Sequence, residues 1–149
     1  MPNTSTKQRF FAVLNAGSSS LKYSLFAEMT DGRLERRTSG GIEGIGSATP
    51  SFTAYDSDQY CIDEYHWSSS AQLDILIRFL IDWIEKFLSP NHLSAVGHRM
   101  LHGGTLYNEP IIVTHEVLEK MRDLTPLAPL HQPRILQVID AITERYPNL

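Results

Sequence analysis

The sequence lacks the features that mark several protein classes. Only one of its 149 residues is a cysteine, Cys61, so an intrachain disulfide and a cysteine-rich metal site are excluded, which fits a reducing compartment. Positive charge is not in excess, because 13 Lys and Arg stand against 17 Asp and Glu. The net charge of -4 argues against nucleic acid as the main partner. Any anion binding must therefore depend on a few local cations.

Long apolar runs are also missing. The N-terminal MPNTSTKQR is polar and has no hydrophobic core of the kind found in signal peptides. The most apolar stretch, residues 73–88, is interrupted by charged residues, so we predict no membrane span and no membrane partner. A hydrophobic content of 42% with 20% charged residues is typical of a globular protein, and the length suits one domain. We expect a cytoplasmic location.

Residues 9–26, RFFAVLNAGSSSLKYSLF, are the most informative stretch. An apolar run meets the small polar cluster NAGSSS, and alternate residues after it are apolar. This pattern predicts a strand, a tight turn and a second strand. The alternation places Ser20, Lys22 and Ser24 together on the polar face of the second strand.

The turn in this stretch is a candidate phosphate cradle. Gly17 lets a ligand approach the backbone closely, and the serines that follow add N–H and O–H donors. It is not a Walker P-loop, because the second glycine is absent and no helix follows. A serine-rich hairpin with a solvated lysine is the alternative.

The middle of the chain predicts more strands. Asp31-Gly32 is a hairpin turn signal that leads into a third strand over residues 34–38. The glycines between residues 40 and 46 predict a flexible connector. Residues 51–65 predict one or two further strands. Their expected inward residues are Phe52, Tyr55, Tyr60 and Ile62.

Three helices are predicted. The first is capped by one of the serines at 68–70 and runs to about Leu88, with an apolar stripe that packs into the core. A short strand over residues 93–96 follows it. Thr114 is expected to cap the second helix, and Pro133 to stand at the first position of the third.

The segment GHRMLHGG follows the short strand, at a place where α/β proteins commonly bind ligands. The planar guanidinium of Arg99 can clamp a carboxylate or a phosphoryl group, although a solvated arginine fits the same pattern. His98 and His102 are four residues apart, but the neighbouring glycines disfavour the helix that a zinc site would need. We expect packed or hydrogen-bonded histidines.

His131 stands just before the third predicted helix. A helix N-terminus disfavours an imidazolium, so a neutral histidine that donates a hydrogen bond to a ligand oxygen is one interpretation. A histidine that only fixes the loop is the other.

Three segments together resemble the acetate kinase family, which includes propionate and butyrate kinases. They are LNAGSSSLKYSLF at 14–26, VGHRMLHGG at 96–104 and LTPLAPLHQP at 124–133. The resemblance implies an α/β fold of the actin-like type shared with sugar kinases and heat-shock ATPases. The N-terminal lobe of that fold has a mixed sheet with packed helices. The implied reaction transfers the γ-phosphoryl group of ATP to acetate or another short-chain carboxylate with Mg²⁺, giving an acyl phosphate and ADP.

The resemblance also assigns roles on the nucleotide side of a site. Asn15 matches the magnesium-associated asparagine of the family. An amide oxygen suits this hard cation, directly or through water. Lys22 matches the lysine associated with ATP, with Ser18 and Ser20 as neighbouring polar groups.

On the carboxylate side, Arg99 matches the substrate-binding arginine of the family. Leu101 and Leu130 stand where the family has apolar residues near the alkyl group of the substrate. His131 is similar to the catalytic histidine near the transferred group. Gln132 follows it, where many relatives have asparagine.

Finally, the resemblance implies that residues 1–149 correspond to the N-terminal lobe of such an enzyme. In the family, the catalytic aspartate and most of the nucleotide pocket come after this region, beyond the position of Leu149. We therefore expect this chain alone to be inactive and monomeric, and the full-length kinase to be a homodimer. A stand-alone module of the same fold, which binds an anion or nucleotide without transfer activity, is the alternative.

Overall fold

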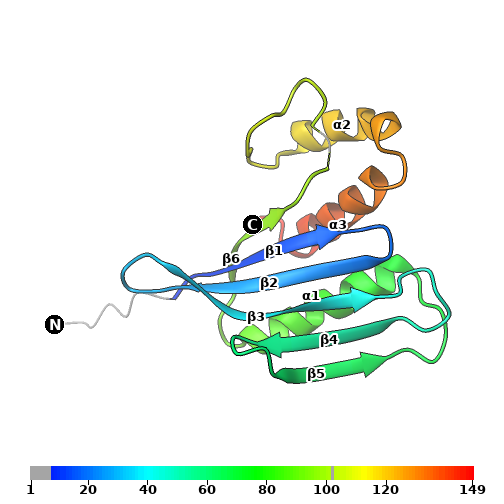
Figure 1. Cartoon of the computed structure of the whole chain (residues 1–149). Coiled ribbons are helices and arrows are strands. Elements are labelled where there is room, and N and C mark those ends of the chain that lie inside the picture. The colour runs from blue at the N-terminus through cyan, green and yellow to red at the C-terminus, as the bar shows by residue number, and fades with distance from the viewer. Residues whose placement is uncertain (1–7, 102) are drawn as a thin grey trace.

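A mixed β-sheet organises the computed structural model, which describes residues 8–101 and 103–149 (Figure 1). Within these residues the sheet has six strands in the order β5-β4-β3-β2-β1-β6. β1 to β5 are antiparallel neighbours, whereas β6 lies parallel to β1 at the edge of the sheet. The strands are β1 (Phe10–Ala16), β2 (Ser20–Glu28), β3 (Leu34–Glu43), β4 (Ser51–Asp56), β5 (Cys61–His66) and β6 (Leu93–His98).

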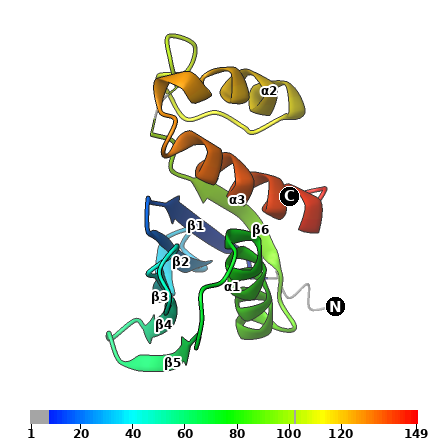
Figure 2. The same cartoon turned by 90° about the vertical axis from the view of Figure 1, so that its right-hand side faces the viewer.

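The helices stack away from one face of the sheet (Figure 2). α1 (Leu73–Leu88) covers that face, α3 (Gln132–Arg145) packs beside it, and α2 (His115–Asp123) packs on α3 at a distance from the sheet. A 3-10 turn, η1 (Thr125–Leu127), joins α2 to the loop before α3. In the described parts of the chain, no helix has both the length and the apolar content needed to cross a bilayer.

Two apolar cores follow from this stacking. The main core lies between the sheet and α1, where the rings of Tyr23 and Phe52 meet those of Phe79 and Trp83. The second core lies between α2 and α3. Its buried members are Leu118, Met121, Ile135, Leu136 and Ile139.

Several expectations are confirmed. β1 and β2 form the predicted hairpin, with Leu21, Tyr23 and Leu25 of β2 buried and Lys22 exposed. The expected strand before GHRMLHGG is β6. Thr114 caps α2, because its hydroxyl oxygen accepts a hydrogen bond from Val117 N (3.3 Å). The expected first position of Pro133 is wrong by one residue, because α3 begins at Gln132 and Pro133 takes its second position.

The flexible connector expected at the glycines is wrong for Gly40 and Gly41. Both belong to β3, which continues to Glu43. A Cβ on Gly40 would lie 2.0 Å from Thr53 O, and one on Gly41 would lie 2.3 Å from Leu21 O. These glycines therefore allow β3 to approach both neighbouring strands, and the loop begins only at Gly44, where φ is +71°.

The inward residues expected for β4 and β5 are correct only at Phe52. Tyr55, Tyr60 and Ile62 are all exposed. Ala54 takes the second inward position of β4, and the register of β4 with β5 shifts between Ala54 and Tyr55.

The expected serine cap of α1 is also wrong. The helix starts at Leu73 after Gln72, which makes no side-chain cap hydrogen bond. Trp67 N–H donates to Pro50 O (3.0 Å), and Trp67 and Ala71 pack against the main core. These contacts hold the serine segment outside the helix.

Candidate functional site

The hairpin β1–β2 and the neighbouring strand β3 place four polar residues on the uncovered face of the sheet. Asn15 lies directly opposite Lys22, and Ser20 lies directly opposite Glu43. Residues that face each other in antiparallel strands point to the same side. Because Leu21 between them is buried beneath α1, these polar residues lie on the opposite face.

Lys22 makes only a weak ion pair, with Glu43. Its Nζ lies 3.5 Å from Glu43 Oε1, with the two side chains 60% and 58% exposed. An ion pair this exposed contributes at most about 1 kcal/mol. An anionic ligand can therefore compete with the Glu43 carboxylate for the ammonium group.

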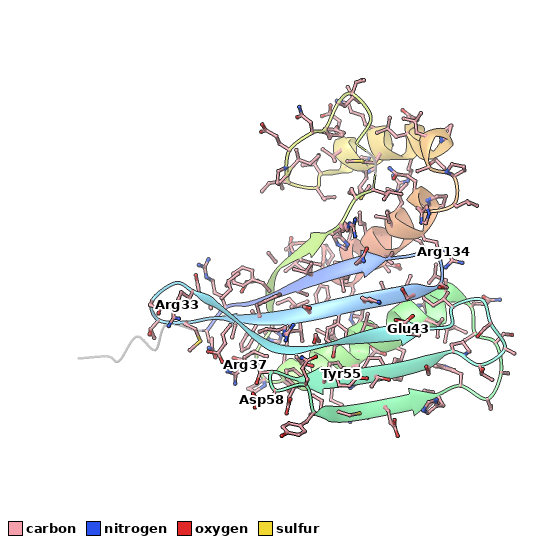
Figure 3. All side chains as sticks on the ribbon, viewed as in Figure 1. Arg33, Arg37, Glu43, Tyr55, Asp58 and Arg134 are labelled. Atoms are coloured by element: carbon pink, nitrogen blue, oxygen red, sulfur yellow. The ribbon has the colours of Figure 1, made fainter. Side chains whose placement is uncertain are left out.

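The turn between β1 and β2 is held from several directions. Gly17 N–H donates to Ser20 O (2.8 Å) and closes the turn. The Arg134 guanidinium, from the first turn of α3, donates to Ser18 O. Figure 3 shows Arg134 beside this turn, at the same end of the sheet as Glu43. The predicted ATP-binding residues Ser18 and Ser20 thus lie next to the start of α3.

Arg99 directly follows β6 and lies at this same end of the sheet. Its N–H donates to Leu14 O (3.1 Å), which extends the parallel pairing of β1 and β6 by one residue. Arg99 is therefore beside the end of β1, where Asn15 follows Leu14. The fold brings the predicted carboxylate ligand and the predicted magnesium ligand onto adjacent strands.

The neighbour of Arg99 does not add to the positive charge. His98 lies opposite Leu14, and burial lowers its pKa to about 4. The imidazole is consequently neutral at pH 7, as expected for a packed histidine. His102, the other histidine of this segment, lies outside the described residues.

His131 reaches the site through α3. It occupies the position before the helix, where its N–H donates to Ala128 O (3.1 Å) and its carbonyl oxygen accepts from Ile135 N (3.1 Å). Arg134, three residues later, contacts the β1–β2 turn. The histidine is half-buried, and the contact of Arg134 brings the first turn of the helix that follows it to the β1–β2 turn.

Gln132 fixes the loop that carries His131. Its side chain is fully buried, and Nε2 donates to Met121 O (3.2 Å) at the end of α2. Oε1 has no hydrogen-bond partner among the described residues. The glutamine thus ties the end of α2 to the beginning of α3.

The two predicted alkyl-contact residues are not enclosed. Leu101 is 53% exposed and Leu130 is 76% exposed. Two surface hollows, of about 400 and 300 Å³, lie elsewhere along α1 and α3. The second borders Leu93, at the opposite end of β6 from Arg99. Within the described residues, both leucines therefore lie on the open surface and line neither hollow.

The residues present fit a magnesium ion only in part. Across residues 8–101 and 103–149, no three His, Cys, Asp or Glu side chains gather into a metal-binding cluster. Mg²⁺ commonly takes one or two protein oxygens and completes its shell with phosphate oxygens and water. Asn15 can provide one neutral oxygen of such a shell.

The contact of Arg134 with Ser18 O is one that the motifs did not indicate. A cation in the first turn of a helix is disfavoured by the helix dipole. This unfavourable position is the feature of the sequence that could have drawn attention to Arg134. It indicates that Arg134 interacts with a group outside its own helix, which the structure shows to be Ser18 O.

Comparison with known proteins shows similarity to one family of kinases. A sequence model described as the acetokinase family matches residues 10–149. An acetate kinase of Rhodopseudomonas palustris (strain TIE-1) is 38% identical over 138 residues, which cover 92% of this chain and 34% of that protein. An acetate kinase of Deinococcus radiodurans is 35% identical over 137 residues, covering 92% and 33%. The chain therefore spans about a third of the length of these relatives.

Solved structures agree with the sequence comparison. An acetate kinase of Porphyromonas gingivalis superposes with a TM-score of 0.77 at 30% identity, covering 94% of this chain and 35% of that one. A propionate kinase of Francisella tularensis superposes with a TM-score of 0.78 at 24% identity, covering 95% and 35%. The expected fold, of the actin-like type with a mixed sheet and packed helices, is confirmed.

Proposed function

Because the chain belongs to the acetokinase family, we propose that residues 1–149 form the N-terminal lobe of a kinase that transfers the γ-phosphoryl group of ATP to acetate or another short-chain carboxylate. The products are an acyl phosphate and ADP. The lobe supplies part of the site, and the catalytic aspartate lies in the part of the relatives that this chain does not span. The complete kinase is proposed to be a cytoplasmic homodimer.

On the nucleotide side, the β1–β2 turn and Lys22 bind phosphate oxygens. Lys22 exchanges its weak pairing with Glu43 for the stronger charge of the phosphates. Asn15, opposite Lys22, would hold Mg²⁺ through its amide oxygen. A bound Mg²⁺ supplies positive charge that offsets the negative charge of the phosphates.

On the carboxylate side, Arg99 binds the substrate carboxylate through its planar guanidinium. His131 donates a hydrogen bond to an oxygen of the group being transferred. Leu101 and Leu130 offer apolar surface to the short alkyl chain. The exposure of both leucines leaves them free to close around that chain together with other parts of the enzyme.

The observation that carries this proposal is the backbone hydrogen bond from Arg99 to Leu14. It fixes the candidate carboxylate ligand beside Leu14 of β1, the residue directly before Asn15. Phosphoryl transfer between two anions depends mainly on holding them in line and offsetting their charge. Arg99 would hold the carboxylate, and the β1–β2 turn with Lys22 would hold the phosphates beside it. This arrangement would both align the two anions and offset their charge.

Amide chemical shifts of the ¹⁵N-labelled chain test the proposal. Acetate is expected to shift Arg99 and His131, and Mg·ATP to shift Ser18 to Ser20 and Lys22. Arg99→Ala should abolish the acetate response and leave the Mg·ATP response in place. An acetate response that survives in Arg99→Ala would refute the assignment of Arg99.

The same preparation is expected to form no acyl phosphate from acetate, ATP and Mg²⁺, because the chain spans about a third of its relatives. Hydroxamate detection checks this, with the Rhodopseudomonas palustris enzyme as the positive control. Formation of acetyl hydroxamate by this chain alone would contradict the proposed division of the site.

A further inference from the structure

The carbonyl oxygens of the β1–β2 turn are held from two distant parts of the chain. Ser18 O accepts a hydrogen bond from Arg134, which is 116 positions away in the sequence. Ser19 O accepts from Ile45 N (2.9 Å), in the loop after β3. Each of these contacts fixes one peptide unit of the turn.

Fixing a carbonyl also fixes the N–H on the other side of the same peptide. In a trans peptide the C=O of one residue and the N–H of the next point in opposite directions. The contact with Arg134 therefore turns Ser19 N–H away from α3. The contact with Ile45 turns Ser20 N–H away from the loop after β3. Within the described residues, Ser18 N–H and Ser19 N–H have no hydrogen-bond partner.

The place of Arg134 in its helix supports a role outside that helix. It lies in the first turn of α3, where the helix dipole disfavours a cation. Among the described residues, its guanidinium donates to Ser18 O rather than to an acidic side chain. Figure 3 shows Arg134 at the turn, whereas the other labelled arginines lie at the far end of the sheet.

We propose that Arg134 is a positioning residue of the phosphate-binding turn. It holds the Ser18–Ser19 peptide so that Ser19 N–H faces the phosphate oxygens. This inference rests on the proposed function, in which the turn binds ATP phosphate. Without the guanidinium, the peptide can rotate and present a carbonyl oxygen to the anion, which repels it.

The test uses the ¹⁵N-labelled chain with Mg·ATP as the probe. The variants are Arg134→Met, which removes the donors, and Arg134→Lys, which keeps the charge. Arg122→Met is the matched control, because it removes the same charge from an arginine that pairs with Asp140 (2.7 Å) and does not contact the turn. Titrations give Kd, and N–H residual dipolar couplings give the direction of the Ser19 and Ser20 amides.

Arg134→Met is expected to raise the Kd for Mg·ATP by about tenfold, since a hydrogen bond to an anion is stronger than a neutral one. The Ser19 N–H coupling should change while that of Ser20, held by Ile45, stays the same. Arg134→Lys should lie between the wild type and Arg134→Met. Arg122→Met should match the wild type in both measurements.

The outcomes separate this inference from the proposed function. If Mg·ATP shifts none of Ser18 to Ser20 in the wild type, the proposed nucleotide site is overturned, and this inference with it. If the wild type binds but Arg134→Met binds equally well, only the role of Arg134 is overturned. A weaker affinity with an unchanged Ser19 coupling also overturns it, because Arg134 would then act by charge alone. If Arg134→Met fails to fold, the Kd and the Ser19 coupling of Arg134→Lys are compared with those of the wild type instead. Values equal to the wild type would then overturn the role of Arg134.

Discussion

At the scale of single residues, Glu43 is the ion-pair partner of Lys22, the proposed phosphate ligand. Its carboxylate lies 3.5 Å from the ammonium group and competes with an anionic ligand. Glu43→Gln is therefore expected to strengthen binding of metal-free ATP by about threefold, the size of a weak surface ion pair. Isothermal titration calorimetry measures this.

Glu35→Gln is the matched control for that substitution. Glu35 is also an exposed glutamate of β3 and pairs with Arg37 at 3.2 Å, at the other end of the strand. It should leave ATP binding unchanged. Weaker ATP binding in Glu43→Gln would mean that the carboxylate holds Lys22 in its binding position instead of competing for it.

His98 makes the stability of the chain depend on pH. Its folded pKa is about 4, below its usual value of 6.5, so the unfolded chain takes up a proton first as the pH falls. The stabilisation is present above pH 6.5 and is lost between pH 6.5 and about 4. Between pH 7.5 and 5.0, the wild type should lose about 2 kcal/mol more stability than His98→Asn.

Urea unfolding at the two pH values checks this prediction. The carboxylates are the same in both proteins, so the difference between their losses isolates His98. Equal losses in the wild type and His98→Asn would mean that the imidazole is protonated in the folded chain.

At the scale of elements, the approach of β3 to its neighbours depends on glycine. A Cβ on Gly40 would lie 2.0 Å from a backbone oxygen of β4, which cannot move without disturbing the ladder. Gly40→Ala is expected to destabilise the chain by about 2–4 kcal/mol. Chemical denaturation measures this.

Gly97→Ala in β6 is the control for that substitution. Its Cβ would meet atoms no closer than 3.8 Å, an ordinary contact, so the change should stay within about 1 kcal/mol. If Gly40→Ala proved as harmless as Gly97→Ala, β3 would be able to move away from β4 at little cost.

The elements also show what the sequence could and could not predict. The β1–β2 hairpin was predictable because its signal, the alternation from Ser20 to Leu25, is local. The strand position of Gly40 was not, because it depends on the close approach of a neighbouring strand. The outward position of Tyr55 depends on a register shift that the alternation does not reveal.

The candidate site also contains both residues that the sequence predicted and a contact that it did not. Arg99 and His131 were predicted from their motifs, and their roles stay predictions; the structure places Arg99 directly after β6 and His131 directly before α3. The contact between Arg134 and Ser18 was not recognisable, because it joins positions 116 residues apart. Only the packing of α3 against the sheet brings those two residues together.

At the scale of the whole molecule, the two cores differ in strength. α2 buries only Leu118 and Met121, and it packs on α3 instead of the sheet. We expect α2 to open with a free energy at least about 2 kcal/mol smaller than that of β2. Native-state hydrogen exchange with mass spectrometry checks this, with peptides from residues 115–123 and 20–28.

The dependence of exchange on urea completes that experiment. Local opening of α2 should depend little on urea, whereas exchange from β2 should follow global unfolding. Identical exchange of the two peptides at every urea concentration would show instead that both cores unfold as one unit.

The position of Cys61 has a practical consequence. It is the only cysteine of the chain, it is exposed, and it lies on β5, at the opposite edge of the sheet from β6 and Arg99. A maleimide fluorophore would therefore attach at one known point, three strand spacings, or roughly 14 Å, across the sheet from β2, which carries Lys22. That separation lies within the range of energy transfer to a labelled nucleotide, so the native chain can report its own ligand binding without any engineered residue.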